Sequence, residues 1–318
     1  ERRGGLSNTT KVWLGLATIY VVWGSTYLAI RVGLRTMPPM LMAGTRFLAA
    51  GGILYAWAIR RGDTMGDRPG RRQWAAAAIV GGLLFLGGNG GVTLAETRLP
   101  SGITALLIAT MPLWMAVLSR LFLGARLPPL AVAGLMLGFA GTAVLVRPTG
   151  LQHLDLAGVA IALTAALCWA SGSLAMTRLA LPSRLSVSTA IQMLAGGAFM
   201  IVVGVARGEL ARVHPAQISL GSAAALAYLV VVGSLVGFST YTWLLATTRT
   251  SLISTYAYVN PVVAVLLGWL FLSERLTAQT LGASSLIVLA VAMIVWARRT
   301  RGPFSTESAR GGAAPTTG

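Results

Sequence analysis

The 318-residue sequence has few charged side chains, few acids and almost no cysteine. Charged residues make up 10% of it. A soluble globular protein has about 25%, so that class is excluded. The single cysteine, Cys168, lies in an apolar stretch and can form no disulfide within the chain. The 8 acids and 2 histidines lie in connections, termini and helix ends. We therefore predict no metal site, no cofactor and no nucleophilic centre, and the absence of a phosphate-binding Gly-Lys-Ser/Thr loop argues against an ATPase.

Apolar residues are abundant instead, with a mean hydropathy of +0.75. They come in blocks of about 20 residues, the length that a helix needs to cross a bilayer. The pattern predicts an all-α integral membrane protein with ten transmembrane helices. We place them at 12–30, 41–59, 74–94, 101–122, 129–146, 156–177, 186–206, 221–245, 251–272 and 277–297.

The net charge of +17 arises from basic residues in the connections between these blocks. Such residues flank membrane helices, so we predict contact with the lipid bilayer and no nucleic-acid partner. One face of the predicted topology holds 17 Lys and Arg and the opposite face 7. The excess places both termini in the cytoplasm of a multi-pass protein in the bacterial inner membrane.

The chain contains an internal repeat. Without gaps, residues 102–127 align with 251–276, and Pro112 falls on Pro261. Both segments also end in Leu-Phe-Leu-x-x-Arg-Leu. The helices at 12–30 and 156–177 match through Trp23 and Trp169.

The repeat predicts two sets of five helices. Because five is odd, the second set enters the membrane from the other side, so the predicted fold is two inverted five-helix repeats. We expect them at 12–149 and 150–299, followed by a disordered tail at 300–318 that is rich in Gly, Ser, Thr and Pro.

Polar and large aromatic residues inside the spans are the candidates for a site. Trp23, Tyr27 and Trp169 lie near the middle of their helices. They are interpreted either as lining a cavity or as packing helices closely through neighbouring glycines. Arg46 likewise either attracts an anionic group in a cavity, or reaches the membrane surface or caps backbone carbonyls.

Two further patterns point to the same helices. Asn89 lies in Gly87-Gly88-Asn89-Gly90-Gly91, which indicates close helix contact or a kink, and its counterpart region contains Tyr241. Pro112 and Pro261 free the carbonyls four residues before them. Such carbonyls are tolerated only against protein or water, so Tyr256 and Asn260 are expected beside a cavity, although a purely structural kink remains an alternative.

Four stretches together resemble the EamA family of the drug/metabolite transporter superfamily. They are Trp23 to Arg31, Arg46-Phe47, Met111-Pro112-Leu113 and Tyr258 to Val262. The resemblance covers about 12–298. It implies an inner-membrane exporter of small metabolites, amino acids or drugs, with a central cavity between the halves. The first repeat departs from the family pattern at Ala125, where the second has Glu274.

We therefore predict a transporter that binds a small molecule and alternates access at the repeat interface, as a monomer or homodimer. The alternatives are an integral membrane enzyme acting on lipid-linked substrates, which would need clustered carboxylates or histidines, and a passive channel. We expect no proton coupling, because no acid lies within a predicted span. Glu96, just beyond 74–94, has Arg98 nearby to keep it charged.

Overall fold

The computed structural model describes residues 8–62, 69–124, 128–146, 155–248, 253 and 255–299. All regular structure in these ranges is helical. The α-helices are α1 (Asn8–Gly33), α2 (Pro39–Arg60), α3 (Arg71–Gly81), α4 (Gly91–Glu96), α5 (Ser101–Ile108), α6 (Met111–Leu123), α7 (Pro129–Val146), α8 (Leu156–Ala175), α9 (Leu185–Ala206), α10 (Leu220–Tyr228), α11 (Gly237–Thr247), α13 (Tyr256–Leu272) and α14 (Ala278–Arg299). The other elements are π-helices η1 (Gly82–Gly90) and η4 (Leu229–Val236) and 3₁₀-helices η2 (Glu209–Arg212) and η3 (Pro215–Gln217).

Eight of these segments are long and apolar enough to cross a membrane, and two shorter apolar helices lie at Pro129–Leu145 and Val259–Leu272. Each of them overlaps a stretch in which hydropathy predicts a membrane helix. The predicted tail at 300–318 lies outside the described residues.

Two expected helices differ in detail. The helix expected at 74–94 continues through η1 and α4 to Glu96, so this acid belongs to the last helical turn. The helix expected at 101–122 is divided into α5 and α6 just before Pro112. The ring of proline cannot continue a regular hydrogen-bond ladder, which explains the break.

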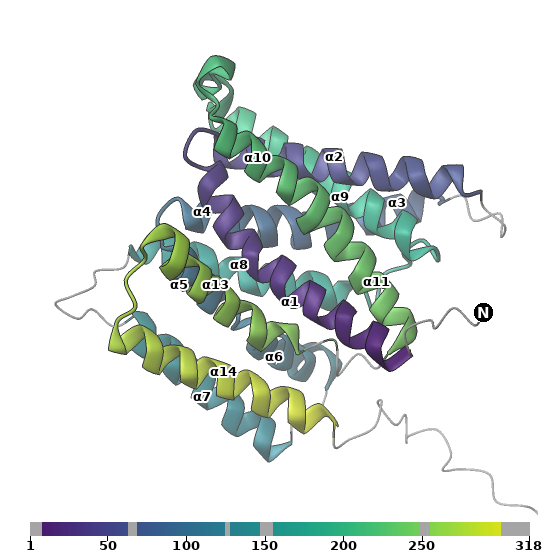
Figure 1. Cartoon of the computed structure of the whole chain (residues 1–318). Coiled ribbons are helices and arrows are strands. Elements are labelled where there is room, and N and C mark those ends of the chain that lie inside the picture. The colour runs from purple at the N-terminus through teal and green to yellow at the C-terminus, as the bar shows by residue number, and fades with distance from the viewer. Residues whose placement is uncertain are drawn as a thin grey trace, which may run out of the picture.

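The helices pack in pairs that join the first and second halves of the chain. Among the strongest contacts are those of α7 with α14, α2 with α9 and α1 with α13. Figure 1 shows α7 and α14 together at one edge of the bundle, with α1 crossing its middle. The helix pairs of η1 with α8 and of α1 with α11 complete the centre of the bundle.

The two halves end corresponding helices in the same way. Gly124 and Ser273 both have the left-handed backbone conformation, with φ of 62° and 54°. Their N–H groups bond to the carbonyls of Ser119 and Gly268. The pair lies 149 positions apart, as Pro112 and Pro261 do.

Glycine permits one close approach that shapes the centre. An added Cβ at Gly87 would lie 2.8 Å from the Sγ atom of Cys168, and one at Gly88 would lie 3.0 Å from the ring of Trp169. The glycine-rich stretch therefore packs η1 directly against α8, as the close-contact interpretation expected.

Candidate functional site

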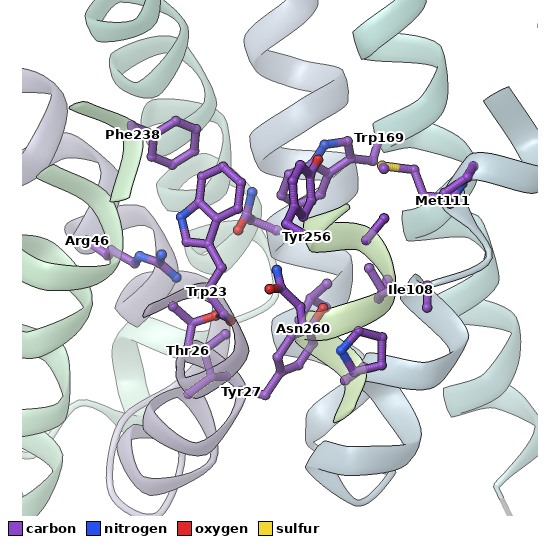
Figure 2. A pocket seen from close by; sticks show the side chains of 18 residues that line it. Trp23, Thr26, Tyr27, Arg46, Ile108, Met111, Trp169, Phe238, Tyr256 and Asn260 are labelled. Carbon is purple, nitrogen blue, oxygen red and sulfur yellow. Dashed lines mark hydrogen bonds between the residues drawn. The ribbon is translucent and has the colours of Figure 1, made fainter. Parts of the chain in front are cut away.

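A cavity of about 80 Å³ lies among the helices of both halves. On this measure one water molecule needs about 10–15 Å³, so several could enter. Figure 2 shows Arg46 and Trp169 on opposite sides, with Trp23, Tyr256 and Asn260 between them. The lining residues are Trp23, Thr26, Tyr27, Ile30, Arg46, Asn89, Val92, Ala105, Ile108, Ala109, Met111, Pro112, Trp169, Phe238, Tyr256, Ala257, Asn260 and Pro261.

The structure brings the expected site residues together. Trp23, Tyr27, Arg46, Asn89, Trp169, Tyr256 and Asn260 all line this cavity. Tyr241 lies behind the wall, where its ring contacts those of Trp23 and Tyr256 at centroid distances of 5.3 and 6.2 Å.

Trp23 is the centre of an aromatic cluster. Besides Tyr241, its ring contacts those of Tyr256 at 5.1 Å and Phe238 at 5.4 Å. Tilted and edge-on ring contacts of this kind contribute about 0.5–1.5 kcal/mol each beyond area burial. The cluster joins α1 to α11 and α13, so it holds the two halves together as well as lining the cavity.

Arg46 is 5% exposed and contacts the second half of the chain. Its Nε atom donates a hydrogen bond to the Ser234 hydroxyl at 3.0 Å, and its guanidinium lies 4.6 Å from the ring centre of Phe47. The side chain therefore lies inside the bundle rather than reaching the membrane surface. Among the described residues that line the cavity, it is the one charged group. Gln192 is the counterpart of Arg46 in the second repeat, because the offset that matches Trp23 to Trp169 also matches Arg46 to Gln192. Its side-chain nitrogen donates to the Ser188 hydroxyl within α9 at 2.9 Å.

The proline of α13 exposes backbone acceptors at the cavity. Pro261 has no N–H to donate to the carbonyl of Ala257, and both residues line the cavity. In the amide orientation that its neighbours favour, Asn260 donates to the carbonyls of Tyr20 and Tyr256 at 3.2 and 3.3 Å. Asn260 thus links α13 to α1 next to Pro261.

Asn89 has a local role as well as a place at the cavity. Its side-chain nitrogen donates to the carbonyl of Leu84 at 3.1 Å, inside the π-helix. The wider turn of a π-helix is common at functional sites. Asn89 and Trp169 both line the cavity.

Sequence patterns alone did not identify Phe238, Met111 or Ser234. Phe238 precedes Tyr241 by three positions, so helical spacing could have indicated it. Ser234 lies in η4 and faces Arg46 only because α2 packs against η4. No pattern in either segment indicates that contact.

Three of the four acids in the described ranges bind the N-termini of helices. Glu209 accepts from the N–H groups of Met40 and Leu41, and Asp155 from those of Ala157 and Gly158. Glu274 accepts from the N–H groups of Ser101 and Gly102. Carboxylates are favoured there because the first N–H groups of a helix have no helical partner.

Glu96 differs from these three. It is fully buried, and neither of its carboxyl oxygens accepts a hydrogen bond from the described part of the chain. The expectation that Arg98 keeps it charged is wrong. Arg98 pairs with Asp155 at 2.7 Å, at an exposed position.

Comparison with known proteins places this architecture in a family. The family model of the EamA-like transporter family matches twice, at residues 11–147 and 156–296. The uncharacterized inner membrane transporter YedA of Escherichia coli (strain K12) is 38% identical over 280 residues, covering 88% of this chain and 89% of YedA.

More distant relatives extend over similar lengths. A probable amino-acid metabolite efflux pump of Escherichia coli (strain K12) is 27% identical, over 83% of this chain and 88% of that protein. A protein of known crystal structure is 23% identical and has the same fold, with a TM-score of 0.62 over 92% of this chain and 100% of that chain.

Proposed function

The chain belongs to the EamA-like transporter family and is a membrane transporter, and we propose that it exports small carboxylate-bearing metabolites by alternating access at the central cavity. Family membership removes the enzyme alternative, because the relatives are transporters. The proposal concerns the substrate class, the direction of transport and the residues involved. The single observation that carries it is a cavity between the two halves in which Arg46 is the one charged residue among the described residues of the lining.

The lining favours a substrate with one anionic group and an apolar body. The Arg46 guanidinium supplies donors for a carboxylate, and the rings of Trp23, Trp169 and Tyr256 supply apolar surface. The carbonyl of Ala257 offers an acceptor for an ammonium group. An amino acid with an apolar side chain meets all three conditions, in line with the name of the efflux pump relative.

We further propose ten membrane crossings in two inverted repeats, at 12–149 and 150–299. The two separate family matches support this division. So do the left-handed caps at Gly124 and Ser273 and the π-helices at corresponding places in each half. A two-fold axis between the repeats would exchange α2 with α9 and α7 with α14. The members of each pair are in close contact, as expected for helices that lie beside such an axis.

The proposed orientation has both termini in the cytoplasm. α1 begins and α14 ends on the same side of the bundle (Figure 1), and that side carries the excess of basic residues. The proposed functional unit is a monomer or a homodimer in a bacterial inner membrane.

Counterflow in proteoliposomes tests the proposal. Vesicles loaded with unlabelled L-leucine or L-phenylalanine should take up the labelled amino acid, and Arg46→Gln should lower this uptake at least tenfold. Arg61→Gln is the matched control, because Arg61 contacts Trp57 outside the cavity. Uptake of cationic probes but not of these amino acids would contradict the proposed substrate class. Uptake that is equal in Arg46→Gln and wild type would show that Arg46 does not bind the substrate.

A further inference from the structure

We propose that Glu96 is a proton-binding site which couples transport to the proton gradient, an inference that rests on the transport function proposed above. It replaces the expectation of uncoupled flux. That expectation depended on Glu96 lying beyond the end of its helix, whereas Glu96 is the last residue of α4.

The first argument is the environment of the carboxyl group. Glu96 and Glu209 are both buried, at 0% and 1% exposure. Glu209 accepts hydrogen bonds from two backbone N–H groups, at 2.9 and 3.1 Å. Glu96 accepts none from the described residues. An ionised carboxylate at Glu96 would lack the donors that offset the cost of removing a charge from water, whereas the protonated group is neutral.

The neighbouring arginine does not neutralise this carboxyl group by direct contact. Arg31 directs its Nη1 atom to the backbone carbonyl of Glu96, and the same atom lies 3.5 Å from the carbonyl of Leu99. Its guanidinium therefore binds the C-terminal end of α4, where a cation is favoured. Among the described residues, no ion pair within 4.0 Å joins the side chains of Arg31 and Glu96.

The charged and titratable groups around Glu96 lie on α1, α2 and α8 and in the segment between α13 and α14. Arg31 and Glu274 interact with it electrostatically, and Tyr27 on α1 does so as well. On the other helices that contact α4, α8 carries only Cys168 and α5 carries no titratable side chain. On α2, Arg46 faces the cavity.

The second argument is position relative to the cavity. Val92 lines the cavity, and Glu96 follows it by four residues on the same face of α4. Tyr27 lines the cavity, and Arg31 follows it by four residues on α1. Ala105 lines the cavity, and Ser101, which binds Glu274, precedes it by four residues on α5. On α4, α1 and α5, one helical turn therefore separates a residue that lines the cavity from Glu96, from Arg31 and from Ser101, which binds Glu274.

The repeat-related positions of the sequence do not form a second copy of this cluster. The repeat offsets place Thr177 at the counterpart of Arg31, Leu245 at that of Glu96 and Ala125 at that of Glu274. In each cycle a proton from water forms an O–H bond with one carboxyl oxygen of Glu96 and later leaves to water, and no other bond changes.

Infrared difference spectroscopy tests proton binding without a substrate. The full-length protein in lipid, titrated with pH, should show a C=O stretching band of a protonated carboxyl group that is absent from Glu96→Gln. Glu209→Gln is the matched control and should keep the band. Glu96→Asp should shift it, which identifies the group even if Glu96→Gln folds poorly. A wild-type protein without this band, or a band that persists in Glu96→Gln, would overturn the proposal.

Proteoliposomes test coupling. With L-leucine equal on both sides, a step of one pH unit should move the distribution of L-leucine up to about tenfold if one proton moves per substrate. Glu96→Gln should abolish this accumulation and retain counterflow exchange. Equal accumulation in the variant would refute coupling through Glu96. Absence of counterflow in wild type would refute the proposed substrate, and the infrared result would still decide whether Glu96 binds a proton.

Discussion

The carboxylate of Glu274 binds Ser101, 173 positions earlier in the sequence, through two hydrogen bonds. Its Oε1 atom accepts from the backbone N–H at 2.6 Å and from the hydroxyl at 2.8 Å. The second oxygen accepts from the N–H of Gly102 at 3.0 Å. An acid from the second half of the chain therefore caps the N-terminus of α5 in the first half.

Removing this cap should destabilise the protein. We expect Glu274→Ala to lower the free energy of unfolding by about 1–2 kcal/mol, because the first N–H groups of α5 lose their acceptor. Glu274→Gln keeps one acceptor oxygen and should lower it less. The melting temperature of the purified protein, measured for both variants in one detergent, checks this order. If Glu274→Ala melts at the wild-type temperature, the contact is not a stabilising cap.

The two tryptophans that line the cavity should matter for transport more than an exposed tryptophan does. Trp23→Ala and Trp169→Ala should lower amino-acid counterflow at least about tenfold, which corresponds to roughly 1.4 kcal/mol of binding free energy. Trp269 is 53% exposed on α13 and lies away from the cavity, so Trp269→Ala should transport normally.

Folding has to be followed in the same series. Large-to-Ala changes in a packed region can cost about 3–5 kcal/mol, so Trp23→Phe is the conservative companion that keeps a ring in place. If Trp23→Ala and Trp169→Ala unfold while Trp23→Phe transports normally, packing rather than substrate contact is the role of these rings.

The proposed topology predicts where reporter domains will lie. Fusions after Arg72 and after Arg299 should report cytoplasm, and fusions near Arg147 and Arg212 should report the periplasm. An alkaline phosphatase and fluorescent protein pair at each site gives opposite signals and serves as its own control. A periplasmic signal from the fusion after Arg299 would be incompatible with ten crossings and a cytoplasmic N-terminus.

The exposed pair of Arg98 and Asp155 should contribute stability that depends on pH. The hydrogen bond from Arg98 lowers the pKa of Asp155 below its usual value, and the N–H groups of Ala157 and Gly158 add to this effect. A carboxyl group with a lower pKa in the folded state stabilises it above the pKa of the unfolded state, about 3.9. This stability is lost as the pH falls through the folded-state pKa.

Asp155→Asn should therefore melt below wild type at pH 7, and the difference should shrink as the pH falls below about 4. Arg98→Gln should behave similarly, and the double variant should add little to either change. A difference in melting temperature that stays constant down to acidic pH would show that charge on Asp155 is not its cause.

Much of this architecture follows from local sequence features. Apolar blocks of membrane-spanning length located the helices, because a helix satisfies its own backbone in hydrocarbon. Pro261 predicted a freed carbonyl in its helix. Trp23 and Trp169, near the middle of their helices, were predicted to line a cavity or to pack helices closely. Trp23, Trp169, Pro112 and Pro261 all line the cavity.

Other features depend on which helices meet, and that is decided by packing between residues far apart in the sequence. Arg46 binds Ser234 because α2 lies against η4. Arg98, two residues from Glu96, binds Asp155 instead, because the start of α8 lies beside it. Sequence features therefore predicted the membrane class, the family and most of the polar and aromatic residues that line the cavity. Which charges are paired depends on contacts in space between residues far apart in the sequence, and among the described residues these contacts leave the buried carboxyl group of Glu96 without a hydrogen bond.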